Sequence, residues 1–361
     1  MLEVNIKPVW LFRTESGQDF DLQLLNLLRE IHATGKLTHA STRVGLSYRH
    51  AWNMIARWSD FFGNPLVRME KGRGAKLTLL GEKLLWAEER IQARLAPQFK
   101  NLCSELELEI NRALNESKQV LRIRASHGYA IAKLVEHMSR CIDIQLDLQY
   151  LGSREALQSL ERRECDLAGF HIPESLLGKE AIERFYPEFH RRPMTTIHFV
   201  TRRQGLILAK NNPLKLNGFQ DITQKNARYI NRQHGSGTRM LFELLLEHHG
   251  IQKETINGYQ QEEFTHDAVA AFVASGMADA GLGIEAAARH FNLDFIPLAR
   301  EHYMLACRPE AVDTPYIRDL LILLKTPSFR EAINNIPGYA APLAGVLAKP
   351  GELFDEQPTQ P

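Results

Sequence analysis

The sequence from residue 119 to residue 307 alternates short apolar, β-branched runs with amphipathic segments of helical periodicity. For example, the strand-like run QVLRIRAS precedes the helical segment GYAIAKLVEHMSR, and the run ADAGLGI precedes EAAARHF. Strands that alternate with helices are typical of βαβ units, in which right-handed crossovers join parallel strands. We therefore expect an α/β fold with parallel sheets here, and we predict a pair of strands within HFVTRRQGLILAKNNP.

Polar residues and glycines follow the predicted strands at the points where the helices begin. In open parallel sheets, ligands bind beyond the carboxyl ends of the strands, where helix N-termini offer free N–H groups to an anion. Serine and threonine also cap helices, so the prediction depends on several of them falling at strand ends together. The histidines beside them would also suit a small carboxylate such as formate. The predicted ligand-binding residues are Ser126, His127, Gly152, Ser153, His171, Ser236, Gly237, Thr238, Arg239, Thr265 and His266.

The segment HGSGTR is the sharpest of these motifs. Its glycines let the backbone approach a ligand, and Arg239 can add a fixed positive charge. It is not a Walker loop, because no GK[ST] follows its second glycine, and GLGI at 281–284 lacks the GxGxxG pattern. A hydrolase that uses Ser236 with His234 or His266 is an alternative, although the GxSxG spacing of a nucleophile elbow is absent. The sequence contains no CxxC pair, which would indicate a zinc site. We therefore expect a protein that is not an enzyme and that binds no metal or cofactor.

The first hundred residues show the pattern of a winged helix. A first helix can begin at Asp19 or Asp21 and run to about His32. After a glycine, Thr38 is predicted to cap a short helix, and Ser47 to cap a third helix over YRHAWNMIARWSDFFG. Two short helices joined by a glycine-containing turn are the helix-turn-helix signature. The strands PLVRM and KLTLLG, joined by the tip EKGRGAK, then predict a hairpin wing.

The third helix is predicted to present a DNA-reading face opposite its core face. Trp52, Ile55, Ala56 and Trp58 are the residues expected to face the core. Arginine and asparagine on the other side are the side chains that bind guanine and adenine edges in a major groove. Between Lys36 and Lys76, eight basic residues face only two acidic ones, in a chain whose net charge is only +1. The predicted DNA-binding residues are Thr38, Arg43, Ser47, Tyr48, Arg49, His50, Asn53, Arg57, Arg73 and Lys76.

A helical connector is predicted over 97–117, with a break at Pro97 from the helix before it. Its apolar residues, which include Phe99, Leu102, Leu106 and Ile110, follow an i, i+3, i+4 spacing. Such a stripe pairs with its copy in many dimers, and the alternative is packing on its own domain. We favour a homo-oligomer, a dimer or a tetramer, because two winged helices can bind two half-sites. The polar segment at 115–118 suits a linker.

The N-terminal pattern resembles the DNA-binding domain of ModE-type molybdate-responsive regulators and, more loosely, of LysR-type regulators. The resemblance covers roughly residues 18–95 and rests on GLSY–x–x–AW, PLV and GAKLT–x–x–GE–x–LL. It implies double-stranded promoter DNA as a partner. The wing departs from the family's longer glycine-rich form, with only Gly72 and Gly74 in its tip.

The remainder resembles the periplasmic-binding-protein-like sensor domain of cytosolic regulators, especially its molybdate- or tungstate-binding branch. The resemblance covers about 120–347 and rests on LGSREALQSLERRECDLAGFHIPE, NRQHGSGTR and THDAVAAFVASGMADAGLGIEAAA. It implies two lobes that close on a ligand, the first from about 120–192 plus 302–345 and the second from about 195–300. The ligand positions that it implies are Ser126, Ser153, Ser236, Thr238, Arg239 and Thr265.

These patterns together predict a winged helix-turn-helix domain at 1–96, a connector or dimerisation helix at 97–117, a two-lobed type II sensor domain at 118–347 and a disordered tail at 348–361. The expected function is a transcription regulator whose sensor binds molybdate, tungstate or formate and alters promoter binding. A molybdate store or carrier with a vestigial DNA domain is the second alternative. No apolar run approaches the ~18 residues of a membrane span and no signal peptide is evident, so we expect a cytoplasmic protein without membrane partners.

Overall fold

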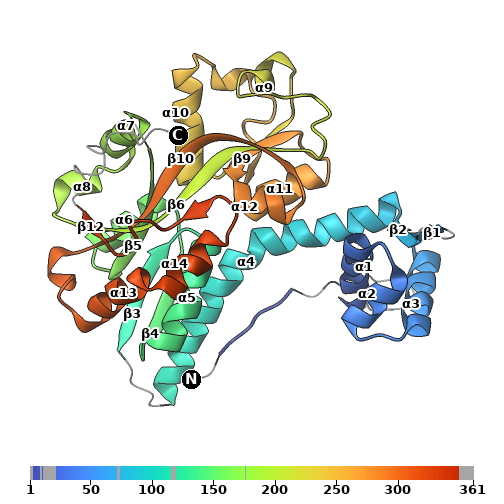
Figure 1. The fold of residues 1–361 in the computed structure, drawn as a ribbon, viewed down its shortest axis with the longest axis horizontal. Helices are drawn as coiled ribbons and strands as arrows, with labels where there is room; N and C mark the ends of the chain where they lie inside the picture. The colour runs from blue at the N-terminus through green and yellow to red at the C-terminus, as the bar shows by residue number, and fades with distance from the viewer. Residues whose placement is uncertain are drawn as a thin grey trace. The chain divides into compact units, whose positions relative to one another are not determined.

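The computed structural model describes residues 3–8, 10, 22–70, 74–114, 119–174 and 176–348 (Figure 1). Two compact units divide the chain. One comprises Lys7–Ala93, and the other comprises Met1–Ile6 with Arg94–Pro361. The expected caps Asp19 and Asp21, the wing-tip residue Arg73, the linker at 115–118 and the tail beyond Ala348 lie outside the described residues.

The N-terminal unit has the element order of a winged helix-turn-helix. Its elements are α1 (Leu22–Thr34), α2 (Leu37–Val44), α3 (Tyr48–Phe61), the antiparallel strands β1 (Val67–Glu70) and β2 (Gly74–Leu77), and the start of α4 (Leu79–Ala113). Gly35 and Gly45 adopt φ angles of 66° and 75°, which glycine tolerates best, and each ends a helix there. The side chain of Ser47 accepts a hydrogen bond from the His50 N–H at 3.2 Å and so caps α3 as predicted.

The core of this unit differs in part from the expected one. Leu28, Ala51 and Trp58 are fully buried, whereas Trp52 is 45% exposed and Ala56 is exposed too. The prediction that Trp52 and Ala56 face the core is wrong, because the inner face of α3 runs through Ala51, Met54, Ile55 and Trp58 at helical spacing. The prediction that Thr38 caps α2 is also wrong, since α2 begins at Leu37 and its N-cap position is Lys36.

The connector is one continuous helix, α4, that contains Pro97. The expected break at Pro97 is absent, although Pro97 has no N–H to donate to the carbonyl of Ala93. Leu102 and Leu106 of the predicted stripe are 48% and 40% exposed in the single chain. Ser104 and Leu108 lie on a different side of the helix and are buried.

The C-terminal unit is built on a ten-stranded sheet with the order β4-β3-β5-β10-β6-β9-β7-β8 and two short strands paired with β6. The first lobe contains β3 (Val120–Ala125), α5 (Tyr129–Cys141), β4 (Gln145–Tyr150), α6 (Ser153–Glu161), β5 (Leu167–Pro173), α7 (Leu176–Phe185), α8 (Glu188–Arg191), α13 (Pro315–Lys325) and α14 (Pro327–Asn334). The second lobe contains α9 (Asp221–Gln224), β7 (Tyr229–Arg232), α10 (Gly237–His248), β8 (Glu262–Glu263), α11 (His266–Ala274), β9 (Ala280–Ile284) and α12 (Glu285–His290).

Two long strands, β6 (Thr195–Leu208) and β10 (Asp294–Cys307), run antiparallel to each other through both lobes. The first lobe pairs its strand β5 with Glu301–Ala306 of β10, and the second pairs its strand β9 with Gln204–Leu208 of β6. The expected strand pair in HFVTRRQGLILAKNNP is therefore a single strand. The expected parallel pairing is present within each lobe, between β3 and β5 and between β7 and β9, whereas the two connecting strands are antiparallel to their neighbours. The short strands β11 (Tyr339–Ala340) and β12 (Leu347–Ala348) add to β6.

Each lobe has its own apolar core. In the second lobe, the rings of Tyr229 and Phe242 stack at 4.5 Å within a cluster that also holds Leu282. In the first lobe, Phe170 and Tyr186 pack edge to face at 5.8 Å. The two clusters meet at α10, because Met240 and Leu244 of this helix pack within the first-lobe cluster while Leu241 and Phe242 pack within the second-lobe cluster.

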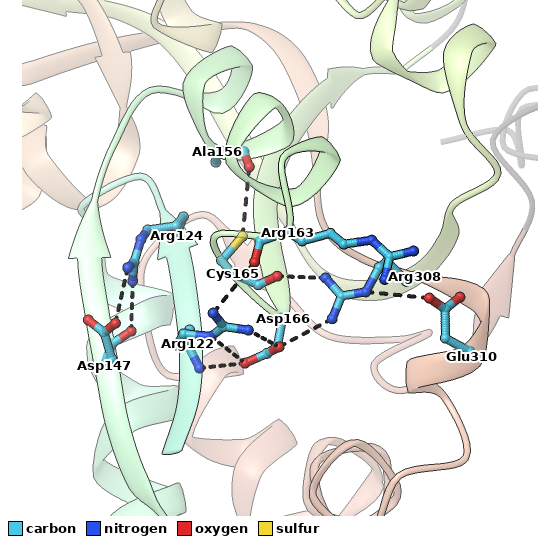
Figure 2. Close-up of polar contacts among 9 residues, drawn as sticks. All are labelled: Arg122, Arg124, Asp147, Ala156, Arg163, Cys165, Asp166, Arg308 and Glu310. Atoms are coloured by element: carbon cyan, nitrogen blue, oxygen red, sulfur yellow. Dashed lines mark hydrogen bonds and ion pairs between the residues drawn. The ribbon is translucent and has the colours of Figure 1, made fainter.

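Arginine–aspartate contacts join β3 to its neighbour β4 and to Asp166, the residue directly before β5 (Figure 2). Asp166 accepts hydrogen bonds from the backbone N–H of Arg122 at 3.0 Å, from its guanidinium at 3.0 and 3.2 Å, and from Arg308 at 3.3 Å. Arg124 donates to Asp147 at 3.0 Å. These contacts stabilise the sheet of the first lobe.

Candidate functional site: the cleft between the two lobes

Four helices begin at the cleft, two from each lobe. Their N-cap residues are Gly128 and Gly152 in the first lobe, and Ser236 and Thr265 in the second. The Ser236 hydroxyl accepts from the Arg239 N–H at 3.1 Å, and the Thr265 hydroxyl from the Ala268 N–H at 2.9 Å. These hydroxyls therefore serve as caps, and the positive ends of all four helix dipoles meet in this region.

The lobes are in contact across the cleft. A Cβ atom placed on Gly152 would lie 3.1 Å from the carbonyl oxygen of Gly235, and one on Gly237 would lie 3.1 Å from the Cβ of His171. Tyr129 of the first lobe also donates a hydrogen bond to Asp267 of the second. The arrangement is a closed one, in which the two glycines allow close approach between the lobes.

Three of the predicted histidines gather in the cleft as neutral rings. His171 Nδ1 lies 3.0 Å from the Ser153 hydroxyl, and its ring is 4.0 Å from that of Tyr303. Burial lowers the pKa of His171 and His266, and brings the pKa of His127 to about 4. At neutral pH each imidazole can donate one N–H without carrying a charge.

The connecting strands carry a buried ion pair between the two lobes. Arg202 of β6 and Glu301 of β10 are register partners, are 2% and 0% exposed, and form a hydrogen-bonded salt bridge. Gln204 donates to Glu301 at 2.8 Å and to the Thr238 hydroxyl at 3.0 Å, which links α10 to the connecting strands. Burial opposes the charge of Arg202, but the neighbouring charge of Glu301 raises the pKa of Arg202 above its usual value. Arg202 therefore stays protonated.

Arg232 supplies a second buried cation, at the end of β7. It is 6% exposed and donates to the Phe264 carbonyl and the Gln233 side chain, both at 3.0 Å. Within the described part of the chain it forms no ion pair. Burial, and then the charge of Arg202, lower the pKa of Arg232 to about 9, so it remains protonated at neutral pH. A buried charge without a counter-ion is costly unless a ligand supplies one.

Several buried polar atoms of this cluster have no hydrogen-bond partner among the described residues. The unpaired atoms are Arg202 Nη1, His171 Nε2, His266 Nδ1, Gln204 Oε1 and Glu301 Oε2. Buried polar groups are usually paired, so a group of unpaired ones in one cleft marks a place where a ligand or water completes them. Because Glu301 neutralises Arg202, the net positive charge of the cluster comes from Arg232.

The ligand residues predicted from the sequence lie in or beside this cleft. The side chain of one of them, Arg239, is bound to other residues of its own lobe. Ser126, His127, Gly152 and Ser236 line a cavity of about 550 Å³, whereas Ser153, His171, Thr238, Thr265 and His266 are at most 5% exposed. Arg239 instead donates to Glu243 at 2.8 Å and lies over the Tyr259 ring at 4.1 Å. Its charge is already neutralised, so the expectation that it offers a fixed charge to the ligand is not met.

Sequence reasoning missed Arg202, Gln204, Arg232, Glu301 and Tyr303. The predicted residues lie at the ends of strands, whereas all of the missed ones except Arg232 lie within the long connecting strands. The available signal was the presence of charged residues inside apolar runs, as in HFVTRRQGLIL. Ser236, the nucleophile of the hydrolase alternative, forms no hydrogen bond with a histidine among the described residues and accepts the capping N–H instead.

In the N-terminal unit, the outer face of α3 carries the predicted DNA-reading residues. Arg49, His50, Asn53 and Arg57 are all exposed. They share this face with Tyr48 and Trp52, whose rings stack at 6.3 Å. Elsewhere on this unit, Arg43 pairs with Glu30 at 3.0 Å and Lys76 with Glu70 at 3.2 Å, both through exposed side chains. Such exposed pairs contribute little to stability.

Comparison with known proteins identifies the family. A family model of the PBP superfamily domain matches residues 135–325, more than half of the chain. The chain belongs to this superfamily, whose match spans most of both lobes. Across the described residues, no helix combines the length and the apolar character needed to cross a membrane.

The proteins that are similar to the chain include YvgK, MopB and OxyR. YvgK of Bacillus subtilis (strain 168), an uncharacterized protein, is 28% identical over 212 residues, which are 59% of this chain and 68% of YvgK. The molybdenum-pterin-binding protein MopB of Rhodobacter capsulatus is 32% identical over 115 residues, 31% of this chain and only 41% of MopB. The solved structure of a cysteine-to-serine mutant of Corynebacterium glutamicum OxyR with H2O2 bound is 14% identical, with a TM-score of 0.43 over 86% of this chain and 93% of that one.

Proposed function

We propose that the protein is a DNA-binding transcription regulator whose two lobes close on an oxyanion. The observation that carries the proposal is Arg232, a buried cation with no ion-pair partner among the described residues. It lies with Arg202 and three neutral histidines in a cleft where four helices begin. An anion would supply the missing counter-charge and accept hydrogen bonds from the unpaired donors.

The number of donors favours a tetrahedral oxyanion over a carboxylate. Arg202 Nη1, His171 Nε2 and His266 Nδ1 each lack a partner, and Arg232 and the helix N-termini add further N–H groups. Four oxygens can accept more of these bonds than the two of formate. The likeness to a molybdenum-pterin-binding protein supports molybdate or tungstate as the first choice, and formate remains the second.

The DNA-binding half of the proposal rests on the N-terminal unit. Its element order is that of a winged helix, and the exposed face of α3 offers Arg49, Asn53 and Arg57 to a groove. A regulator of this kind works in the cytoplasm as a homo-oligomer and needs no enzymatic step. A molybdate store or carrier would use the same cleft but would not bind DNA specifically.

The test combines DNA selection with an anion panel. The full chain is used to select duplexes from random DNA, and fluorescence anisotropy then measures the affinity for the selected duplex with and without sodium molybdate, sodium tungstate, sodium sulfate and sodium formate. The proposal predicts a selected sequence whose affinity changes with one of these anions. Anion binding without any selected sequence would support the carrier instead.

A further inference from the structure

The connector helix α4 forms part of the wall of the effector cleft. The cavity of about 550 Å³ is lined by Ser126, His127 and Arg232 of the candidate site, and also by four residues of α4. These four are Arg94, Pro97, Gln98 and Asn101. They recur at helical spacing, so one side of the helix faces the cavity.

Asn101 ties α4 to the first lobe. Its Oδ1 accepts from the Tyr150 N–H at 2.7 Å, and its Nδ2 donates to the Tyr150 carbonyl at 3.3 Å. Tyr150 is the last residue of β4, directly before the turn that carries Gly152 and Ser153. A side-chain amide that satisfies both backbone groups of one residue fixes the helix to the end of that strand.

Arg94 ties the same helix to the second lobe. Its guanidinium lies 3.8 Å from the carboxylate of Glu263, which is 2% exposed, and 5.5 Å from the centre of the Phe264 ring. The carbonyl of Phe264 also accepts a hydrogen bond from Arg232. Phe264 therefore contacts both Arg94 and the arginine of the proposed anion site. The two anchors are seven residues apart along α4, about two helical turns.

Bridging both lobes makes the helix sensitive to closure. When two lobes rotate apart, Tyr150 and Glu263 separate, and a rigid helix cannot hold both contacts. Upstream of Arg94, the same helix continues into the N-terminal unit. Pro97, between the two anchors, removes one hydrogen bond from the helix, to the carbonyl of Ala93 at the boundary between the units.

We propose that α4 is a wall of the effector site and that its anchors, Asn101 and Arg94, report closure of the lobes to the DNA-binding unit. Effector binding favours the closed state, and the closed state is the one in which both anchors form. This inference rests on the proposed function and adds the residues that couple its two sites. Coupling is reciprocal, so DNA and anion must change each other's affinity by the same factor.

The test measures that factor in the full chain and in three variants. Asn101→Ala and Arg94→Ala each remove one anchor, and Glu109→Ala changes an exposed residue of the same helix as the matched control. Calorimetry with sodium molybdate, tungstate, sulfate and formate identifies the anion that the wild type binds best. Anisotropy then gives the affinity for the selected duplex with and without that anion, and circular dichroism confirms that each variant is folded.

The coupling factor is the ratio of the DNA affinities measured with and without the anion. We expect this factor to become at least threefold smaller, and so closer to one, in both anchor variants and to stay unchanged in Glu109→Ala. The anchor variants should also bind the anion more weakly, but by less than tenfold. Removal of a residue that binds the anion directly should weaken binding by tenfold or more. If the wild type couples anion and DNA and both anchor variants keep the full ratio, the role of α4 is refuted while the proposed function stands. If no anion of the panel binds to the wild-type chain, the proposed function fails, and this inference fails with it.

Discussion

The hydroxyl of Tyr129 donates a 2.6 Å hydrogen bond to Asp267 Oδ1, joining the first turn of α5 in one lobe to the first turn of α11 in the other. His290 Nδ1 lies 3.2 Å from the same hydroxyl. Burial, and then the charge of Asp267, raise the pKa of Tyr129, so the hydroxyl keeps its proton and can donate. Because the bond joins the two lobes, we expect their separation to break it, so that it stabilises the closed arrangement.

Tyr129→Phe should weaken anion binding because the closed state loses this bond. A hydrogen bond to a charged group contributes about 1.5–3 kcal/mol, so the dissociation constant should rise by about tenfold or more. Calorimetry with sodium molybdate on the full chain measures the change. Tyr316→Phe is the control, since Tyr316 forms no hydrogen bond within the described ranges. Equal affinities for Tyr129→Phe and the control would mean that the bond does not contribute to closure.

Asp166→Asn should lower the free energy of unfolding at neutral pH. Burial opposes the charge of Asp166, but the hydrogen bonds from Arg122 and Arg308 lower its pKa below the usual value (Figure 2). We expect a loss of about 1.5–3 kcal/mol, because the charged partner of two arginines is removed. Glu310→Gln is the control, since Glu310 is 64% exposed and lies 3.6 Å from Arg308.

The same substitution has a predictable pH dependence. A carboxyl group with a lowered folded pKa contributes stability above its unfolded pKa of about 4, and this contribution is lost as pH falls through the folded value. The difference between wild type and Asp166→Asn should therefore shrink as the pH is lowered from about 7 to about 3 in urea unfolding series. A difference that grows on acidification would contradict the assigned pKa direction.

The location of the candidate site was only partly predictable from the sequence. The alternation of strands and helices predicted α5, α6, α10 and α11, and the residues at their starts do meet in one cleft. The sequence could not place Arg202 against Glu301, because their pairing depends on two strands about a hundred residues apart in the chain. The sequence prediction named Arg239 and did not consider Arg232, and only the packing of Arg239 against Tyr259 and Glu243 shows that its charge is neutralised.

Arg49→Ala should weaken binding to the selected duplex. Arg49 is exposed on the outer face of α3, and an arginine that pairs with a base edge contributes about 1–3 kcal/mol to specific binding. Arg112→Ala, which removes an exposed arginine at the end of α4, is the control. Anisotropy with the selected duplex and with a scrambled one separates the effects. If Arg49→Ala leaves specific affinity intact, α3 reads DNA through another face or not at all.

Leu102→Asp should dissociate a dimer. Leu102 and Leu106 are large apolar side chains exposed on one helix. Pairing with the same helix of a second chain would remove this apolar stripe from water. Light scattering should give twice the 41.2 kDa of one chain for the wild type, or a larger multiple, and the mass of one chain for Leu102→Asp. Ile322→Asp alters another exposed apolar residue, on α13, and should leave the mass unchanged. A wild-type monomer that binds a two-half-site duplex would rule out this interface.

The central claim is that Arg232 holds an anion, and calorimetry of Arg232→Gln with sodium molybdate, tungstate, sulfate and formate tests it most directly. Without anion, the melting temperature of Arg232→Gln should not fall below that of the wild type, because a buried charge without a counter-ion is removed. With the anion that the wild type binds best, Arg232→Gln should bind about 10–100-fold more weakly, as expected for one or two charge-assisted hydrogen bonds. Arg239→Gln should stay within about threefold of the wild type, since its charge is already paired with Glu243. An Arg232→Gln variant that binds the anion as tightly as the wild type would contradict the account.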